Sequence, residues 1–326
     1  MNPRKISVTV LKRSVFKNIK KRNPESVSAP YVGMDCAVMK NVKDYTYVTV
    51  NPVICGERYC EMGIIKAANN ISCMGGNIRA VLVNVMFGAG YDEKQLKSIM
   101  KRLEAMCDVL DIQIAGGHTC VMSGLSQAVI SITGMGDGDD AQSASLKRIT
   151  PGEDIVITKT IGMEGSAIIA DMKEEELKAR FSQQFVDSLK YSNEDFLILS
   201  EAAVAIKHGV TAMHDLSEGG IFAALWDICE ASGKGISIDI KKIPVKQALI
   251  EACELYDLNP YELISGGSLL LVTKNGNELV QSLKESGIRA EVIGKTTDTN
   301  DKIILNGDEI RYLDTPSRDE IYKILG

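Results

Sequence analysis

The sequence predicts a two-domain α+β protein. Its 326 residues exceed what one hydrophobic core usually organises. Strand-like and helix-like apolar patterns alternate through both halves. Between the halves lie a polar stretch, Gly136 to Asp140, and a turn at Pro151-Gly152. We therefore expect one domain over residues 1–148 and a second over residues 149–326.

The first domain shows the apolar spacing of strands and the apolar spacing of helices. Residues 45–50 alternate between apolar and polar as in a strand, and residues 57–73 have helical spacing that stops at Gly75-Gly76. A second helix follows over residues 93–110, with Asp92 as its N-cap. The remaining expected strands are residues 79–87, 113–115 and 127–133.

The second domain interleaves strands and helices joined by short turns. Its expected strands are residues 154–158, 268–273, 289–293 and 302–305. Its expected helices are residues 193–208, 218–231 and 245–256. This order predicts sheets covered by helices.

Composition narrows the function classes. A formal net charge of −6 and an aromatic content of 5% argue against nucleic acid as the main partner. The chain has no apolar stretch of signal-peptide or membrane-spanning length. Its eight cysteines include no C-x-x-C pair, which is typical of reduced thiols. We expect a cytoplasmic protein that does not bind membranes.

Four glycine-marked segments stand out: 33–38, 68–76, 115–119 and 213–220. In the first, Asp35 follows the flexible Gly33 and is suited to face a cation bound to polyphosphate, although a solvated turn is the usual role of such a sequence. In the second, Asn70 lies near the end of a helix, where it is either a site residue or a helix cap. In the third, His118 follows two glycines.

The fourth segment is the most specific signal in the second half. Ser217 is placed to cap the following helix, and Glu218 complements the positive end of the helix dipole. Gly219 and Gly220 would let a ligand approach the backbone closely, which predicts an anion site. A well-capped core helix is the alternative, but it gives no reason for two glycines in the first turn.

In this order and at these spacings, the four segments resemble the aminoimidazole ribonucleotide (AIR) synthetase superfamily. The superfamily includes thiamine monophosphate kinase, selenophosphate synthetase and a hydrogenase-maturation protein. The resemblance covers roughly residues 30–315. Residues 243–260 and 264–269 look closest to the hydrogenase-maturation branch.

The resemblance implies an AIR synthetase-like fold, with an N-terminal ferredoxin-like half that pairs across a homodimer. It also implies ATP and Mg²⁺ as cofactors, and activation of an oxygen, amide or thioamide by ATP-dependent phosphorylation of a small-molecule or protein substrate. The implied catalytic residues are His118 and Asp215. The implied nucleotide-binding residues are Gly33, Asp35, Asn51, Asn70, Gly116, Gly117, Ser217, Glu218, Gly219 and Gly220. The implied metal ligands are Asp35 and Asn70.

Several family acids are replaced in this chain. Met34, Asn51, Asn70 and His118 stand where relatives carry carboxylates. Amides offer Mg²⁺ oxygen without negative charge, which predicts a weakened metal site. The hydrogenase-maturation branch also carries a reactive C-terminal cysteine, whereas this sequence has no cysteine after Cys253, so thiocarbamate chemistry is not expected.

Two alternatives remain open at this stage. One is a nucleotide- or metabolite-binding homodimer whose catalysis has been altered. The other is a thiol or soft-metal site formed by Cys36, Cys73, Cys120 and His118, since thiolates and imidazole suit a softer metal than Mg²⁺. Against the second, free cysteine is among the most commonly buried residue types. His118 also suits general-base chemistry, because imidazole titrates near neutral pH.

Overall fold

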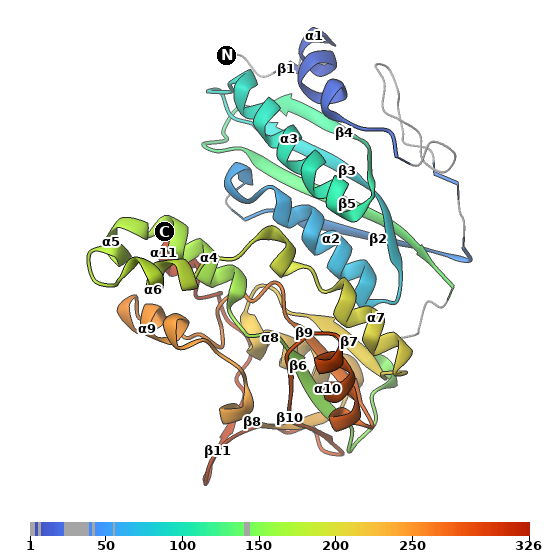
Figure 1. The fold of residues 1–326 in the computed structure, drawn as a ribbon, viewed down its shortest axis with the longest axis vertical. Coiled ribbons are helices and arrows are strands. Elements are labelled where there is room, and N and C mark those ends of the chain that lie inside the picture. Colours follow the sequence, from blue (N-terminus) through green and yellow to red (C-terminus); the bar gives the residue numbers. More distant parts are fainter. Residues whose placement is uncertain (1–3, 6–7, 23–38, 41–42, 55, 140–143) are drawn as a thin grey trace. The chain divides into compact units, whose positions relative to one another are not determined.

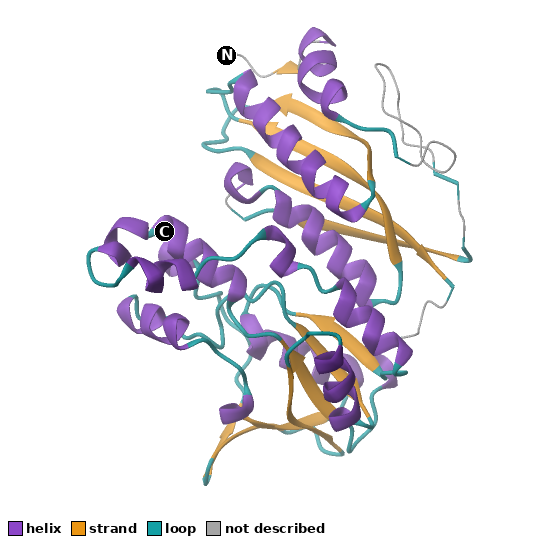
Figure 2. Ribbon diagram, viewed as in Figure 1, coloured by secondary structure: helices purple, strands orange, loops and turns teal. Residues whose placement is uncertain are grey.

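The computed structural model describes residues 4–5, 8–22, 39–40, 43–54, 56–139 and 144–326. The chain divides into two compact units, Met1–Ala141 and Gln142–Gly326, each combining a sheet with helices (Figures 1 and 2). The predicted two-domain α+β class is confirmed. The division falls shortly before the boundary expected near residue 148. Gly136 to Gly138, which were expected in the polar stretch at the boundary, belong to a strand.

The first unit contains a five-stranded sheet in the order β1-β4-β3-β5-β2. β3 and β4 are parallel, while the other neighbouring pairs are antiparallel. The strands are β1 (Arg4–Lys5), β2 (Tyr45–Pro52), β3 (Asn77–Phe87), β4 (Gln113–Val121) and β5 (Val129–Gly138). Both β4 and β5 run further than the patterns predicted.

Two long helices, α2 (Glu61–Cys73) and α3 (Glu93–Leu110), lie side by side across one face of this sheet (Figure 1). α3 has the expected bounds, because Asp92 accepts from the Lys94 amide and Gln95 completes a capping box. α2 begins later than expected, since residues 56–59 form a short 3₁₀ turn. It ends where Gly75 adopts φ 78°, as the glycine pair predicted.

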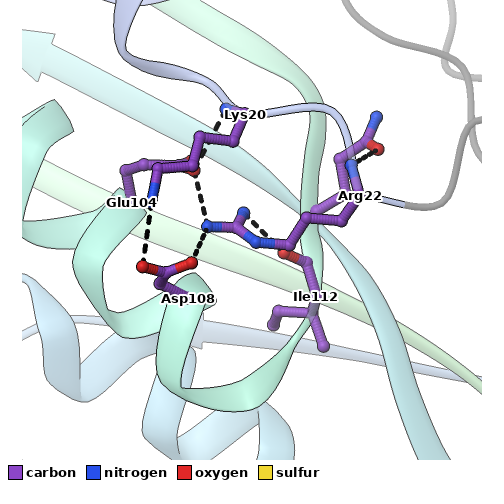
Figure 3. A network of polar contacts seen from close by, with 6 residues as sticks. Lys20, Arg22, Glu104, Asp108 and Ile112 are labelled. Atoms are coloured by element: carbon purple, nitrogen blue, oxygen red, sulfur yellow. Dashed lines mark hydrogen bonds and ion pairs between the residues drawn. The ribbon is translucent and has the colours of Figure 1, made fainter.

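The segment before the first glycine motif is anchored to α3 by a polar network (Figure 3). Arg22 contacts Glu104 at 2.7 Å and Asp108 at 3.0 Å, and it donates to the Ile112 carbonyl at 2.9 Å. The Lys20 amide also donates to Glu104. The side chains of Arg22 and Glu104 are 8% and 7% exposed, so this is a buried ion pair.

The second unit contains a seven-stranded sheet in the order β12-β11-β8-β10-β6-β9-β7. Only β8 and β11 pair in parallel. The strands are β6 (Asp154–Thr158), β7 (Ala212–Asp215), β8 (Gly235–Asp239), β9 (Leu269–Thr273), β10 (Ala290–Thr297), β11 (Lys302–Asn306) and β12 (Glu309–Tyr312). Its core is aliphatic and includes Ile155, Ile236, Leu270 and Ile293.

The second unit also contains helices, of which the two over residues 220–232 and 276–285 pack on this sheet (Figure 2). The helices are α4 (Met163–Met172), α5 (Glu174–Lys178), α6 (Gln183–Ser188), α7 (Leu199–Lys207), α8 (Gly220–Ser232), α9 (Gln247–Leu255), α10 (Gly276–Glu285) and α11 (Tyr322–Leu325). The expected helices correspond to α7, α8 and α9. Across the described residues, no helix is both long and apolar enough to cross a membrane.

Candidate functional site

In the first unit, Asn51 and Asn70 come together although 19 positions separate them in the chain. Asn51 lies near the end of β2, and Asn70 lies in α2, which packs on that strand. Asn70 donates from Nδ2 to Oδ1 of Asn51 at 3.0 Å and to the Thr49 hydroxyl at 3.0 Å. The predicted alternative of Asn70 as a helix cap is wrong, because α2 continues to Cys73 and its C-cap is Met74.

This pairing is electrically neutral. Two carboxylates at 3.0 Å would repel one another and would need a proton or a cation between them. Two amides satisfy each other as donor and acceptor, so they need neither. Their oxygens can still ligate a hard cation, but they bring it no charge. In this arrangement both N–H groups of Asn70 are used inside the cluster, on Asn51 and Thr49, and the pair offers a cation only neutral oxygens.

Within one chain, His118 does not lie near Asn51 and Asn70. It is exposed on β4 and pairs with Asn84 of β3. Asn51 belongs to the adjacent row of the sheet, with the buried Val83, on the face that α2 covers. Neighbouring rows point to opposite faces. β2 and β4 are also separated by two strands, about 14 Å at the usual interstrand spacing. The structure thus brings Asn51 and Asn70 together and leaves His118 apart from them.

The two glycines before His118 belong to β4 and not to a loop. A Cβ at Gly117 would lie 1.9 Å from the Val83 carbonyl oxygen, so the close approach of β3 requires glycine there. Gly117 therefore has a packing function whether or not a ligand binds nearby. Gly116 pairs with Leu82 in the same ladder.

Gly33, Asp35 and Cys36 lie outside the described residues, so their predicted roles stay predictions. Of the other expected thiols, Cys73 is buried at the end of α2 and Cys120 is half-buried on β4. Within the described ranges, no three His, Cys, Asp or Glu residues gather closely enough to hold a metal ion. The soft-metal alternative gains no geometric support from them.

In the second unit, the loop over residues 215–220 joins β7 to α8. Gly219 and Gly220 adopt φ 82° and 63°, which glycine favours over other residues. A Cβ at Gly220 would lie 2.5 Å from the Tyr261 carbonyl oxygen. The two glycines thus serve a sharp turn and close backbone packing.

Ser217 does not cap α8 as predicted. The N-cap is Gly219, and the Ser217 carbonyl accepts from the amides of Gly220 at 3.2 Å and Ser265 at 3.1 Å. The Gly219 amide donates to the carboxylate of Asp319 at 2.5 Å. Both glycine N–H groups are therefore used within the chain, and the predicted role of Gly219 and Gly220 in nucleotide binding stays a prediction. Asp215 ends β7, and the loop after it carries Ser217 and Glu218.

Asp319 is the site residue that the sequence did not indicate. It is 3% exposed, and its other oxygen accepts from the amides of Ile264 at 3.2 Å and Ile321 at 2.7 Å. Burial raises the pKa of its carboxyl above the ordinary value, although its three backbone N–H partners favour the ionised form. No local pattern marks it, because its partner Gly219 lies 100 positions away.

Glu218, which was expected to complement the helix dipole, is exposed and contacts the C-terminal helix. Its hydrogen bond with the Tyr322 hydroxyl, together with burial, raises the pKa of Tyr322 to about 12. Two residues near the end of the chain thus contact this loop: Asp319 contacts Gly219, and Tyr322 contacts Glu218.

Comparison with known proteins identifies the class. Residues 33–137 match the model of the AIR synthase related protein N-terminal domain, and residues 150–306 match that of the C-terminal domain. The chain belongs to the AIR synthase related proteins. This confirms the resemblance stated from the glycine-marked segments.

Within this family, its relatives point to the HypE proteins. The chain is 25% identical over 262 residues to the putative hydrogenase expression/formation protein MJ0676 of Methanocaldococcus jannaschii, covering 79% of this chain and 76% of that one. It is 26% identical over 213 residues to carbamoyl dehydratase HypE of Bradyrhizobium diazoefficiens, covering 65% and 60%. A crystal structure of hydrogenase maturation protein HypE in complex with ATP shares the fold, with a TM-score of 0.76, 15% identity, and 97% and 96% coverage. The chain is a HypE-like, AIR synthase-related protein.

Proposed function

We propose that this protein is a homodimer that binds ATP and activates an oxygen, amide or thioamide of its acceptor by ATP-dependent phosphorylation. The observation that carries the proposal is the meeting of Asn51 and Asn70 at 3.0 Å. These residues stand at two family positions for nucleotide and metal contacts, and the fold places both in one cluster. A HypE relative of the same fold binds ATP.

Each unit contributes its own residues to the proposed chemistry. In the first unit, Asn51 and Asn70 are the proposed nucleotide contacts, and the motif positions of Gly33 and Asp35, outside the described residues, suggest the same role for them. His118 moves a proton, since a neutral imidazole is suited to general-base work. In the second unit, Asp215 is the second proposed proton-transfer group, with Ser217 and Glu218 beside it.

The chain fits Mg²⁺ poorly. When bound, Mg²⁺ would neutralise the developing charge on the transferred phosphoryl group. The described donors at Asn51 and Asn70 are neutral, so only Asp35, outside the described residues, would supply charge. We propose that Mg²⁺ binds weakly and that most of the nucleotide affinity is independent of it.

The homodimer is proposed from exposed valines on the face of the first sheet opposite α2, where Met39 packs beside Leu82 and Met135. Val48 and Val50 on the edge strand β2 are 64% and 62% exposed, and they share this face with Leu82 and Met135 of the neighbouring strands. An apolar face beside an unpaired edge invites association with a second copy. The long strand β3 lies inside the sheet and contributes only through its face.

ATP binding and phosphate release test the proposal. Asn70→Ala should weaken ATP binding by more than about tenfold, or ~1.4 kcal/mol, while the exposed Asn306→Ala should change it by less than about twofold. His118→Ala and Asp215→Ala should each lower the rate of phosphate release. An absence of ATP binding, or equal effects at Asn70 and Asn306, would count against the function.

A second candidate is a nucleotide-binding homodimer with altered catalysis. The neutral Asn51–Asn70 pair favours it, because the two amides satisfy each other without a metal. This candidate expects ATP binding without phosphate release above that of an Asp215→Ala variant. The two candidates are therefore separated by the same set of measurements.

A further inference from the structure

The second unit brings three glycine-bearing segments together through backbone contacts. The Ser265 amide donates to the Ser217 carbonyl at 3.1 Å, and the Gly162 amide donates to the Ser265 hydroxyl at 2.8 Å. The Leu216 amide donates to the Ser268 carbonyl at 3.0 Å. Three segments thus meet at one junction: residues 162–165, 215–220 and 263–268. Asp215, the last residue of β7, lies in the second of them.

One buried carboxylate ties two of these segments together. Asp319 accepts from Gly219 in the loop before α8 and from Ile264 in the 263–268 segment. Its third partner, the Ile321 amide, fixes its own backbone. Without Asp319, the amides of Gly219 and Ile264 would lose the partner that satisfies them, at a cost expected for buried donors.

The segment that carries Asp319 is itself anchored at other points. Glu320 accepts from the Asn259 amide at 3.0 Å, and its own amide donates to the Glu262 carbonyl. Lys323 donates to the Asp257 carbonyl at 2.8 Å. The carboxylate is therefore held from a second direction, and it presents a fixed acceptor to the loop.

We propose that Asp319 is a positioning residue for the proposed phosphorylation reaction. It acts through Gly219 to fix the loop that follows Asp215 and places the side chain of Glu218. Two consecutive glycines with positive φ have wide conformational freedom, so this loop needs an external partner to hold one arrangement. The Tyr322 contact with Glu218 adds a second tie at the next residue. The effect of Asp319 on catalysis rests on the proposed function. Its effect on the order of the loop does not.

Asp319→Asn tests this role with little change in side-chain volume. The amide oxygen can still accept from Ile264 and Ile321, but its NH₂ group would face the Gly219 N–H, donor against donor. The matched control is Asp314→Asn, which neutralises an exposed acid five positions earlier. We expect amide hydrogen exchange in residues 215–223 to rise at least about tenfold in Asp319→Asn and to stay unchanged in Asp314→Asn.

The catalytic consequence is measured as phosphate release from ATP at a temperature where both variants remain folded. The expected result is a fall in kcat of at least about tenfold with the ATP Kd changed by less than about threefold. Unchanged exchange in residues 215–223 overturns the inference, and so does raised exchange with unchanged kcat. Raised exchange in a protein whose parent form releases no phosphate overturns the proposed function, while the ordering of the loop by Asp319 stands.

Discussion

Asn70 donates from Nδ2 to Oδ1 of Asn51 at 3.0 Å, and the Thr49 hydroxyl accepts from the same nitrogen. The contact joins an amide at the end of β2 to an amide of α2. The contact is neutral and needs no cation to hold it together. We therefore expect ATP binding to depend little on Mg²⁺.

Asn70→Asp should make stability depend on Mg²⁺. The new carboxylate would lose both donated hydrogen bonds and face the Asn51 oxygen. We expect the free energy of unfolding to fall by about 1–3 kcal/mol in metal-free buffer. Added Mg²⁺ should recover part of the loss, because a carboxylate supplies the missing charge. Thermal or urea unfolding of Asn70→Asp and Asn306→Asp, with Mg²⁺ and with chelator, provides the comparison. If Mg²⁺ stabilises both variants equally, the cluster does not ligate the ion.

The polar network of Figure 3 predicts unequal effects for two neighbouring cations. Arg22→Ala removes the partner of the buried Glu104 and should destabilise the protein by about 3–5 kcal/mol. Lys20→Ala removes a side chain that is 61% exposed and pairs with the exposed Asp108, so it should cost less than about 1 kcal/mol. Urea unfolding of the two variants measures the difference. Equal losses would show that the Arg22–Glu104 pair is not the anchor of the N-terminal segment.

The exposed valines of β2 predict how the proposed dimer can be broken. Val48→Lys and Val50→Lys together place two charges on exposed positions of β2 and should convert a dimer to a monomer at micromolar concentration. Light scattering reports the mass, and circular dichroism checks that the fold is retained. Ile310→Lys with Tyr312→Lys, on the exposed strand β12 of the other unit, is the matched control. A parent protein that is already monomeric would contradict the proposed assembly.

The sequence predicted correctly those helices and strands whose bounds are set by residues close by in the chain. The bounds of α3 follow from Asp92 and Gln95 within one turn, and β6 follows from a single apolar run. β4 is longer than expected because Gly116 and Gly117 suggested a loop, whereas contact with β3 keeps them in a strand. The pattern could not reveal that packing.

The candidate site shows the same limit. Motif positions indicated Asn51 and Asn70, and the fold joins them. The motif positions could not indicate that His118 projects from the other face of the sheet, because the face of a side chain depends on how the strands pair. The capping of α8 was assigned to Ser217, the nearest suitable side chain, while the actual acceptor is Asp319 from the far end of the chain. Long-range hydrogen bonds leave no periodic trace in a single sequence.

The most direct test of the central claim is calorimetric titration of ATP into the parent protein and into Asn51→Asp with Asn70→Asp, each with Mg²⁺ and with chelator. We predict that the parent binds ATP with Kd values that agree within about threefold in the two buffers, because its paired amides supply no charge to the metal. The double variant should bind ATP at least about tenfold more tightly with Mg²⁺ than without it. A parent protein that binds ATP more than about tenfold more tightly with Mg²⁺, or a double variant with no Mg²⁺ dependence, would contradict the account.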